Sequence, residues 1–273
     1  MEQKRVLSVQ DISCFGKCSN TVALPILSAA GLEGVMLPTA LLSTHTAGFT
    51  GFTFLDLTQE MKKMIAHWKT LPLQLDAALT GYFGSAEQLG IVREYLCSQP
   101  GLALFADPVM GDNGKLYSIY DDAFVRGMRE FCRGADVITP NITEASLLAG
   151  VPYAGEQFDD ASVAALLSKL SELQVKRIVL TGLRFGSAEI GVLAYDAETK
   201  ANYIFRTPYV DTYLHGTGDT FAAALCARTM RGRSFPDAVG DALDFTYASI
   251  RNTLSSERRY GLLFEPELGR LAK

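Results

Sequence analysis

Residues 102–139 read LALFADPVMGDNGKLYSIYDDAFVRGMREFCRGADVIT, and the apolar pattern of this stretch decides the fold class. Short apolar runs at 102–107 and 136–139 are typical of buried strands, and a longer segment suited to a helix separates them. The same alternation recurs along the chain, with further strand candidates at 5–10, 34–39, 77–82 and 177–181. Strands joined through helices pair in parallel, so the sequence predicts an α/β fold whose mostly parallel sheet is covered by helices on both faces.

The pattern changes after Thr181. Residues 188–196 and 202–206 alternate around a polar turn at 197–200, which predicts an antiparallel hairpin at the edge of the sheet. Two helices are expected after the hairpin, and the first begins at 216–219. The second carries apolar residues at helical spacing, which are Val239, Leu243, Tyr247 and Ile250.

One proline stands inside a predicted helix. Pro25 follows Asn20 in an otherwise helical segment, and a proline ring removes a hydrogen bond and clashes with the preceding turn. We therefore expect either a kink at Pro25 or a late start of this helix.

Composition excludes several classes of protein. The 273 residues are 48% hydrophobic, which is enough for a packed core, and we expect one domain over residues 1–273. The net charge is −5 with no basic block, so nucleic acid is an unexpected partner. No stretch reaches the roughly 18 apolar residues of a membrane span, and five cysteines are an odd number for a disulfide framework. We expect a cytoplasmic protein without a membrane partner.

The polar segment with the clearest chemistry is HGTGDT at 215–220. Two glycines and two hydroxyls lead into an alanine-rich helix, and backbone N–H groups at such a helix start bind anions. Asp219 stands where a carboxylate could take a proton from an attacking hydroxyl while neighbouring amides hold the developing charge. The same residues would also suit a plain capped helix start.

Two further polar segments follow predicted strands. DPVMGD at 107–112 offers two carboxylates that suit Mg²⁺, and TPNITE at 139–144 places another acidic group at the same sheet edge. In the second segment, Asn141 and Glu144 also have the spacing of a capping box, a purely structural role. No Walker loop is present, because Asp11 and Cys18 stand where a Walker loop ending at Gly16-Lys17 needs a glycine and a hydroxyl. A dinucleotide fingerprint is absent as well.

Taken together, these segments resemble a known family. DPVMGD, TPNITEA and HGTGDTFA, in this order and spacing, are similar to the vitamin B6 kinases of the ribokinase superfamily, the pyridoxal and pyridoxamine kinases. RVLSVQ at 5–10, LSTHTAGF at 42–49 and LTGY at 79–82 extend the resemblance over nearly the whole chain. The resemblance implies a ribokinase-like three-layer sandwich, use of ATP with Mg²⁺, a response to a monovalent cation (K⁺ or Na⁺) and a homodimer.

The resemblance also assigns roles to the segments that follow the strands. Asp219 would be the base for the substrate hydroxymethyl group, within an anion hole formed by Gly216, Thr217 and Gly218. Thr139 and Thr181 would lie near the phosphate or the monovalent ion. The residues around the phosphates and metal would be Asp107, Asp112, Asn141 and Glu144. Of these, Asp107 and Glu144 would serve the metal, with Glu144 acting through water.

On the vitamin side, Thr46 and Tyr82 would contact the pyridine ring, and His45 would support their loop. Asp11 departs from the family, because many pyridoxal kinases carry a serine there. A carboxylate at this position would favour a cationic partner, such as a protonated pyridine or an aminomethyl group, or else would cap a helix or turn.

The resemblance implies ATP-dependent phosphorylation of the 5'-hydroxymethyl group of pyridoxal, pyridoxamine or pyridoxine. Hydroxymethylpyrimidine kinase of thiamin synthesis is the nearest alternative, but members of that family typically have cysteine where this chain has Asp219. A noncatalytic vitamer-binding protein of the same fold is a third possibility. Members of the family that have lost catalysis should lack the base or an anion-hole glycine. Gly216, Gly218 and Asp219 are all present in this chain.

Overall fold

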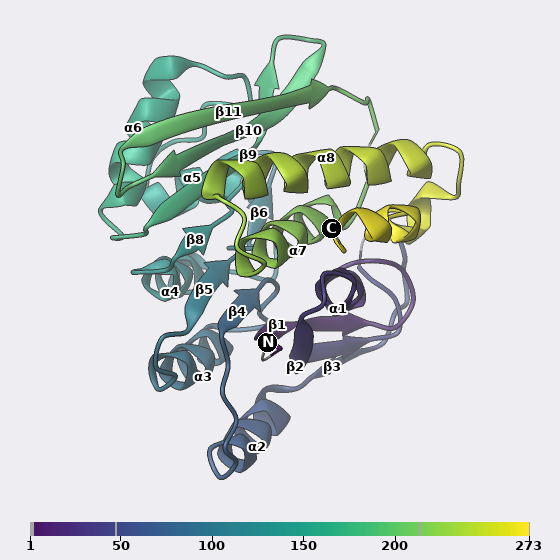
Figure 1. Cartoon of the computed structure of the whole chain (residues 1–273). Coiled ribbons are helices and arrows are strands. Elements are labelled where there is room, and N and C mark those ends of the chain that lie inside the picture. Colours follow the sequence, from purple (N-terminus) through teal and green to yellow (C-terminus); the bar gives the residue numbers. More distant parts are fainter. Residues whose placement is uncertain (1–2, 47, 213, 273) are drawn as a thin grey trace.

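A single nine-stranded sheet forms the middle layer of the protein (Figure 1). The computed structural model describes residues 3–46, 48–212 and 214–272. The strands lie in the order β11-β10-β9-β8-β5-β4-β1-β2-β3. Six of them pair in parallel, namely β1 (Arg5–Ser13), β2 (Glu33–Leu42), β4 (Ala77–Thr80), β5 (Ala103–Ala106), β8 (Val137–Ile138) and β9 (Arg177–Phe185). The antiparallel strands β3 (Phe54–Asp56), β10 (Glu189–Asp196) and β11 (Ala201–Pro208) lie at the two edges.

Helices cover both faces of the sheet (Figure 1). One face packs against α2 (Thr58–Trp68), α3 (Ala86–Cys97), α4 (Asp122–Cys132), α5 (Ile142–Ala149) and α6 (Asp160–Ser171). The other packs against α1 (Asn20–Ala29), α7 (Thr217–Met230) and α8 (Phe235–Thr253). Successive residues of the central strands enter opposite cores, as Val137 and Ile138 do, which explains why these strands are apolar throughout. The predicted three-layer α/β sandwich is therefore confirmed.

Most predicted elements are present, with shifted ends. The strand expected at 136–139 is shorter, and those expected at 5–10 and 177–181 continue to Ser13 and Phe185. The hairpin of β10 and β11 is as expected. The late helix start at Pro25 is wrong, because α1 begins at Asn20 and Pro25 lies inside it. Among the described residues, no helix is long and apolar enough to cross a membrane.

A small hairpin over the carboxyl edge of the sheet was not predicted. It consists of β6 (Gly111–Asp112) and β7 (Lys115–Leu116), joined by Asn113 and Gly114, which both have positive φ angles. Asn-Gly is the residue pair that such a two-residue turn favours, so the signal was present in the sequence. The Gly114 N–H donates to the Thr143 hydroxyl at 2.8 Å, which ties the hairpin to α5.

Candidate active site

A cavity of about 430 Å³ opens at the carboxyl ends of the central strands. Ten of the fourteen predicted site residues line it, namely Asp107, Asp112, Thr139, Asn141, Glu144, Thr181, Gly216, Thr217, Gly218 and Asp219. The carboxyl ends of the parallel strands β5, β8 and β9 lie at the same edge of the sheet, so the residues there are close together. The first turn of α7 lies beside them. The structure therefore brings together what the sequence places more than a hundred residues apart.

The turn that starts α7 requires glycine. Gly216 has φ of +80°, and a Cβ atom added there would lie 2.4 Å from the carbonyl oxygen of Lys17. The Gly216 carbonyl accepts hydrogen bonds from the Thr220 hydroxyl at 2.6 Å and from the Thr220 N–H at 2.9 Å. Gly218 follows in the first turn, and its Cβ position would be 3.7 Å from Asp107 Oδ2. The first turn of α7 thus faces Asp107, and the absence of a side chain at Gly218 leaves the space between them open.

Asp219 lies in the same first turn and is half-buried. Burial raises the pKa of its carboxyl group to about 6, the nearby Asp11 adds to the rise, and the nearby backbone N–H of Ser19 opposes it. A carboxylate with a pKa close to neutral pH is suited to accept a proton from a hydroxyl group.

Asp107 and Glu144 form a buried acidic pair. Burial raises the pKa of Asp107 to about 8 and the charge on Asp219 adds to this, while the Thr139 hydroxyl lowers it. Burial, with the charge on Asp107, likewise raises the pKa of Glu144 well above its ordinary value. Two carboxylates held in this way are stabilised by a cation placed near them.

Glu144 serves the fold as well as the cavity. Its carboxylate accepts hydrogen bonds from the backbone N–H groups of Asn141 at 2.9 Å and Met110 at 3.2 Å. The Asn141 side chain accepts from the Glu144 N–H at 2.9 Å, which completes the capping box at the start of α5. Thr181 lies beside Asn141, since its N–H donates to the Pro140 carbonyl at 3.0 Å. The structural interpretation of this segment is thus confirmed, and its residues line the cavity too.

The charge on the cavity wall bears on which ligands it can accept. Its described lining includes five carboxylates and neither lysine nor arginine, the acidic residues being Asp107, Asp112, Glu144, Glu156 and Asp219. A polyphosphate can enter such a site only with accompanying cations. No cluster of three or more His, Cys, Asp or Glu side chains suited to a metal occurs in the described part of the chain. One or two carboxylates together with waters and phosphate oxygens is the arrangement that Mg²⁺ prefers, so these residues fit Mg²⁺.

An apolar wall of the cavity was not identified as part of the site from sequence. It is formed by Val210, Leu214, Phe221, Leu243, Tyr247 and Ile250. Leu243, Tyr247 and Ile250 were expected on the last helix, and they lie on α8 with their side chains only partly buried. This wall suits a flat aromatic ring. Helical periodicity marks an apolar face but does not distinguish one that covers the core from one that lines a cavity.

The four residues predicted on the vitamin side lie outside this lining. Asp11 is buried, and its carboxylate accepts hydrogen bonds from the hydroxyls of Ser13 at 2.9 Å and of Ser19. Tyr82 lies close enough to Asp11 that this charge, after burial, raises the tyrosine pKa to about 12. Thr46 is exposed in the loop after β2. Asp11, near the end of β1, therefore bonds to neighbouring serine hydroxyls and not to the backbone N–H groups that a helix or turn cap would bind.

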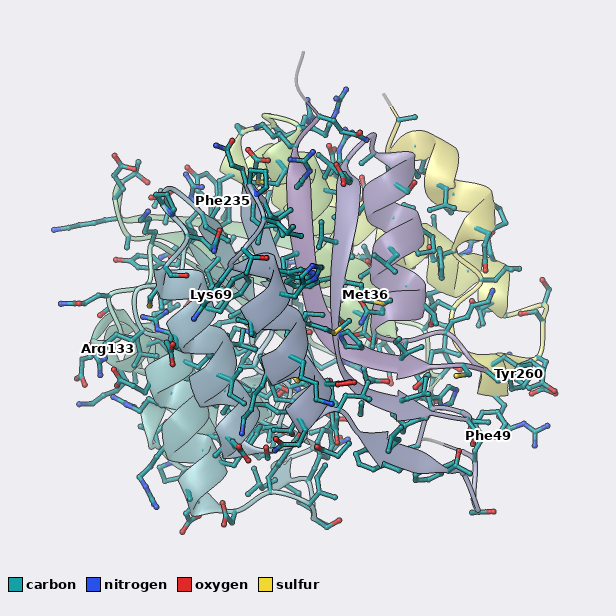
Figure 2. The ribbon with its side chains drawn as sticks, turned by 90° about the horizontal axis from the view of Figure 1, so that it is seen from below. Met36, Phe49, Lys69, Arg133, Phe235 and Tyr260 are labelled. Atoms are coloured by element: carbon teal, nitrogen blue, oxygen red, sulfur yellow. The ribbon has the colours of Figure 1, made fainter. Side chains whose placement is uncertain are left out.

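His45 and the chain near residue 260 pack together beside His215, a residue that lines the cavity. His45 Nε2 lies 3.0 Å from the Arg259 carbonyl oxygen, and the His45 ring is 5.3 Å from the ring of His215, which lines the cavity. Figure 2 shows Phe49 and Tyr260 side by side, and their rings stack at 6.3 Å. No sequence pattern predicts this C-terminal contribution, because it depends on contacts across more than two hundred residues.

These observations can be set beside known proteins. The phosphomethylpyrimidine kinase family model matches residues 24–263. The chain belongs to this family. It is a small-molecule kinase of the ribokinase superfamily, which confirms the resemblance seen in the sequence. Over 94% of this chain and 95% of its own length, the hydroxymethylpyrimidine/phosphomethylpyrimidine kinase of Haemophilus influenzae is 27% identical. The pyridoxine/pyridoxal/pyridoxamine kinase of Bordetella avium is 31% identical over 86% of this chain and 80% of its own.

The similar solved structures are likewise named either as phosphomethylpyrimidine kinases or as pyridoxal kinases. A candidate phosphomethylpyrimidine kinase of Bacteroides thetaiotaomicron, in a crystal form with pyridoxal, is 39% identical with a TM-score of 0.93, covering 99% of this chain and 96% of its own. Pyridoxal kinase of Lactobacillus plantarum is 31% identical with a TM-score of 0.92, covering 99% and 97%. Pyridoxal kinase of Leishmania donovani, in complex with ADP and pyridoxamine, is 25% identical with a TM-score of 0.88, covering 98% and 96%. Similarity alone does not choose between the two substrate classes.

Proposed function

We propose that this protein phosphorylates the 5'-hydroxymethyl group of a vitamin B6 vitamer with ATP. The observation that carries the proposal is Asp219 in the first turn of α7, because a carboxylate stands where hydroxymethylpyrimidine kinases typically have cysteine. The Bacteroides thetaiotaomicron protein whose crystals contain pyridoxal supports it, since it is 39% identical over nearly the whole length of both chains.

In the proposed reaction, the substrate hydroxyl gives its proton to the Asp219 carboxylate as its oxygen bonds to the γ-phosphorus of ATP. The bond between that phosphorus and the β–γ bridging oxygen breaks, and ADP leaves. Backbone N–H groups of Thr217 and Gly218, at the positive end of α7, stabilise the charge on the phosphoryl group in transfer. The apolar wall that includes Leu243 and Tyr247 would hold the nucleotide base.

Asp107 and Glu144 would hold Mg²⁺, which when bound offsets the charge of the phosphates in an otherwise acidic cavity. Glu144 would act through water, because backbone N–H groups already occupy its oxygens. Asp112 and Asn141 would complete this end of the site, and Thr139 and Thr181 would lie near the phosphate or a monovalent cation.

The vitamer would lie between Asp219 and the loops that carry His45, Thr46 and Tyr82. The proximity of His45 to His215 and of Asp11 to both Tyr82 and Asp219 supports this placement. His45 would keep its loop in position, because its ring nitrogen lies beside the Arg259 carbonyl oxygen.

The test is an assay of ADP release with pyridoxal, pyridoxamine, pyridoxine and hydroxymethylpyrimidine offered separately, with each product identified by mass spectrometry. We expect kcat/KM to be highest for a B6 vitamer. A kcat/KM at least tenfold higher for hydroxymethylpyrimidine would assign the protein to the second candidate function. That alternative is favoured by one observation, the match of residues 24–263 to the phosphomethylpyrimidine kinase family.

A further inference from the structure

Ser19 has a backbone conformation that side chains rarely adopt. Its φ is 49° and its ψ is −128°, and it stands in a tight turn in which the Thr21 N–H donates to the Cys18 carbonyl at 3.2 Å. These angles match the second residue of a type II′ turn, a position that strongly favours glycine. A buried serine here is unfavourable for the backbone, so the side chain must contribute something that glycine could not.

The serine hydroxyl does not do what its position predicts. Ser19 is the N-cap residue of α1, where a serine side chain usually accepts a hydrogen bond from the first turn of the helix, and it makes no such bond. Its hydroxyl instead donates to the carboxylate of Asp11, which is itself buried and accepts from Ser13 as well. Asp11, the side chain that departs from the family pattern, therefore holds the strained turn in place through this hydrogen bond.

The other side of the same turn faces the start of α7. The Lys17 carbonyl oxygen and the Cys18 Cα lie 2.4 and 3.7 Å from the Cβ position of Gly216, so the two segments are in direct contact. This contact brings the backbone N–H of Ser19 close to the carboxylate of Asp219. Ser19 thus lies between the two acidic side chains, with its hydroxyl hydrogen-bonded to Asp11 and its backbone amide beside Asp219.

We propose that Ser19 is a positioning residue for Asp219, held in its strained conformation by the Asp11 carboxylate. The inference rests on the proposed role of Asp219 as the base. A turn packed against Gly216 keeps the Ser19 amide beside the Asp219 carboxylate, which limits how that carboxylate can turn and leaves its other lone pairs for the substrate hydroxyl. Asp11 then acts through Ser19, and the vitamer does not need to contact it.

The decisive variant is Ser19→Gly, because glycine accepts the φ angle of 49° and the fold is expected to survive. Loss of the hydroxyl frees the turn from Asp11. We expect kcat to fall about 10- to 100-fold, the size of effect that a misplaced catalytic group produces, with the KM for ATP within about twofold of wild type. Ser13→Ala is the matched control, since it also removes one hydroxyl from Asp11 at 2.9 Å but does not touch Asp219.

Variants of Asp11 separate positioning from substrate binding. If Asp11 anchors Ser19, Asp11→Ala lowers kcat as Ser19→Gly does, the double variant is no worse than either single one, and Asp11→Asn restores part of the activity through its amide oxygen. If Asp11 binds the vitamer directly, Asp11→Ala instead raises the vitamer KM and leaves kcat unchanged. That result, or a kcat within twofold of wild type for Ser19→Gly, would overturn the proposal.

Crystal structures of the wild type and Ser19→Gly make the test independent of the proposed function. We expect the Asp219 carboxylate to change orientation, or to occupy more than one rotamer, in the variant only. An unchanged Asp219 side chain would refute the positioning role even if the wild type phosphorylated none of the offered substrates. Absence of activity in the wild type would by contrast count against the proposed function alone.

Discussion

The carbonyl oxygen of Lys17 lies against Gly216, at 2.4 Å from the point where a side chain at that residue would begin. Gly216→Ala should therefore force the two loops apart, in addition to the strain of alanine at φ of +80°. We expect a loss of stability of about 2–4 kcal/mol together with loss of activity. Chemical denaturation of the variant measures the first effect, and wild-type stability would show that the contact can relax without cost.

Gly218→Ala provides the matched comparison, because its Cβ would meet only Asp107 Oδ2, at the ordinary distance of 3.7 Å. The fold should tolerate this methyl group, whereas the phosphates could no longer approach the helix start. We expect unchanged thermal stability and at least a tenfold fall in kcat/KM. A simultaneous loss of stability would mean that the two glycines have the same structural role.

Asp219 should give the reaction an acidic limb in its pH profile. Because its pKa is raised to about 6, a growing share of the free enzyme carries a protonated Asp219 as the pH falls through that value, and a protonated base accepts no proton. We expect kcat/KM to decline below pH 6, and Asp219→Asn to lower kcat by at least ~10²-fold at pH 7.5. Nearly normal turnover in the variant would remove Asp219 from the mechanism.

Asp107 should reduce stability while it supports catalysis. Its pKa is raised in the folded state, so the folded protein binds this proton more tightly than the unfolded chain does, and wild-type stability should fall as pH rises from about 4 to about 8. Asp107→Asn removes the buried charge. In the absence of metal, we expect its Tm to exceed that of wild type by several degrees near pH 8, with no advantage at pH 4 and a much lower kcat.

Asp112→Asn is the control for this prediction, because Asp112 lines the same cavity but is only partly buried. Its Tm should stay close to that of wild type at both pH values. An Asp107→Asn variant less stable than wild type at pH 8 would show that the buried charge of this carboxylate does not destabilise the fold.

Activity should depend on a divalent cation. The described lining of the cavity has five carboxylates without a lysine or arginine, so the phosphates of ATP have no cationic side chain there to offset their charge. We expect excess chelator to abolish turnover and added Mg²⁺ to restore it, measured by ADP release. Full turnover in chelator would contradict the role given to Asp107 and Glu144.

Local sequence patterns encode the sheet, the helix start near Asp219 and the cap of α5. The alternation of apolar runs with helical segments indicated the sheet, and the glycines of residues 215–220 marked the helix start whose first turn holds Asp219. The spacing of Asn141 and Glu144 indicated a capping box that the structure confirms. In each case a residue type and its near neighbours are sufficient, since turns, caps and buried strands depend on short-range geometry.

The remainder depends on contacts that no local pattern encodes. The contact between Phe49 and Tyr260 joins segments more than two hundred residues apart, and strand β3 has three exposed residues and so no burial pattern to detect. Asp11 was recognised as a departure from the family, but its partner Ser19 was not, because a serine in a glycine conformation leaves no mark in the sequence. The Asn113-Gly114 pair is different, because its residue types do encode the turn between β6 and β7, although that turn was not predicted.

Transfer of phosphate from γ-labelled ATP to pyridoxal, compared between wild type and Asp219→Asn under single-turnover conditions, tests the proposed role of Asp219 most directly. We expect labelled pyridoxal 5'-phosphate with the wild type and at least ~10²-fold slower transfer with the variant, at similar ATP affinity. Release of labelled inorganic phosphate without labelled vitamer, or equal transfer rates in the two proteins, would contradict it.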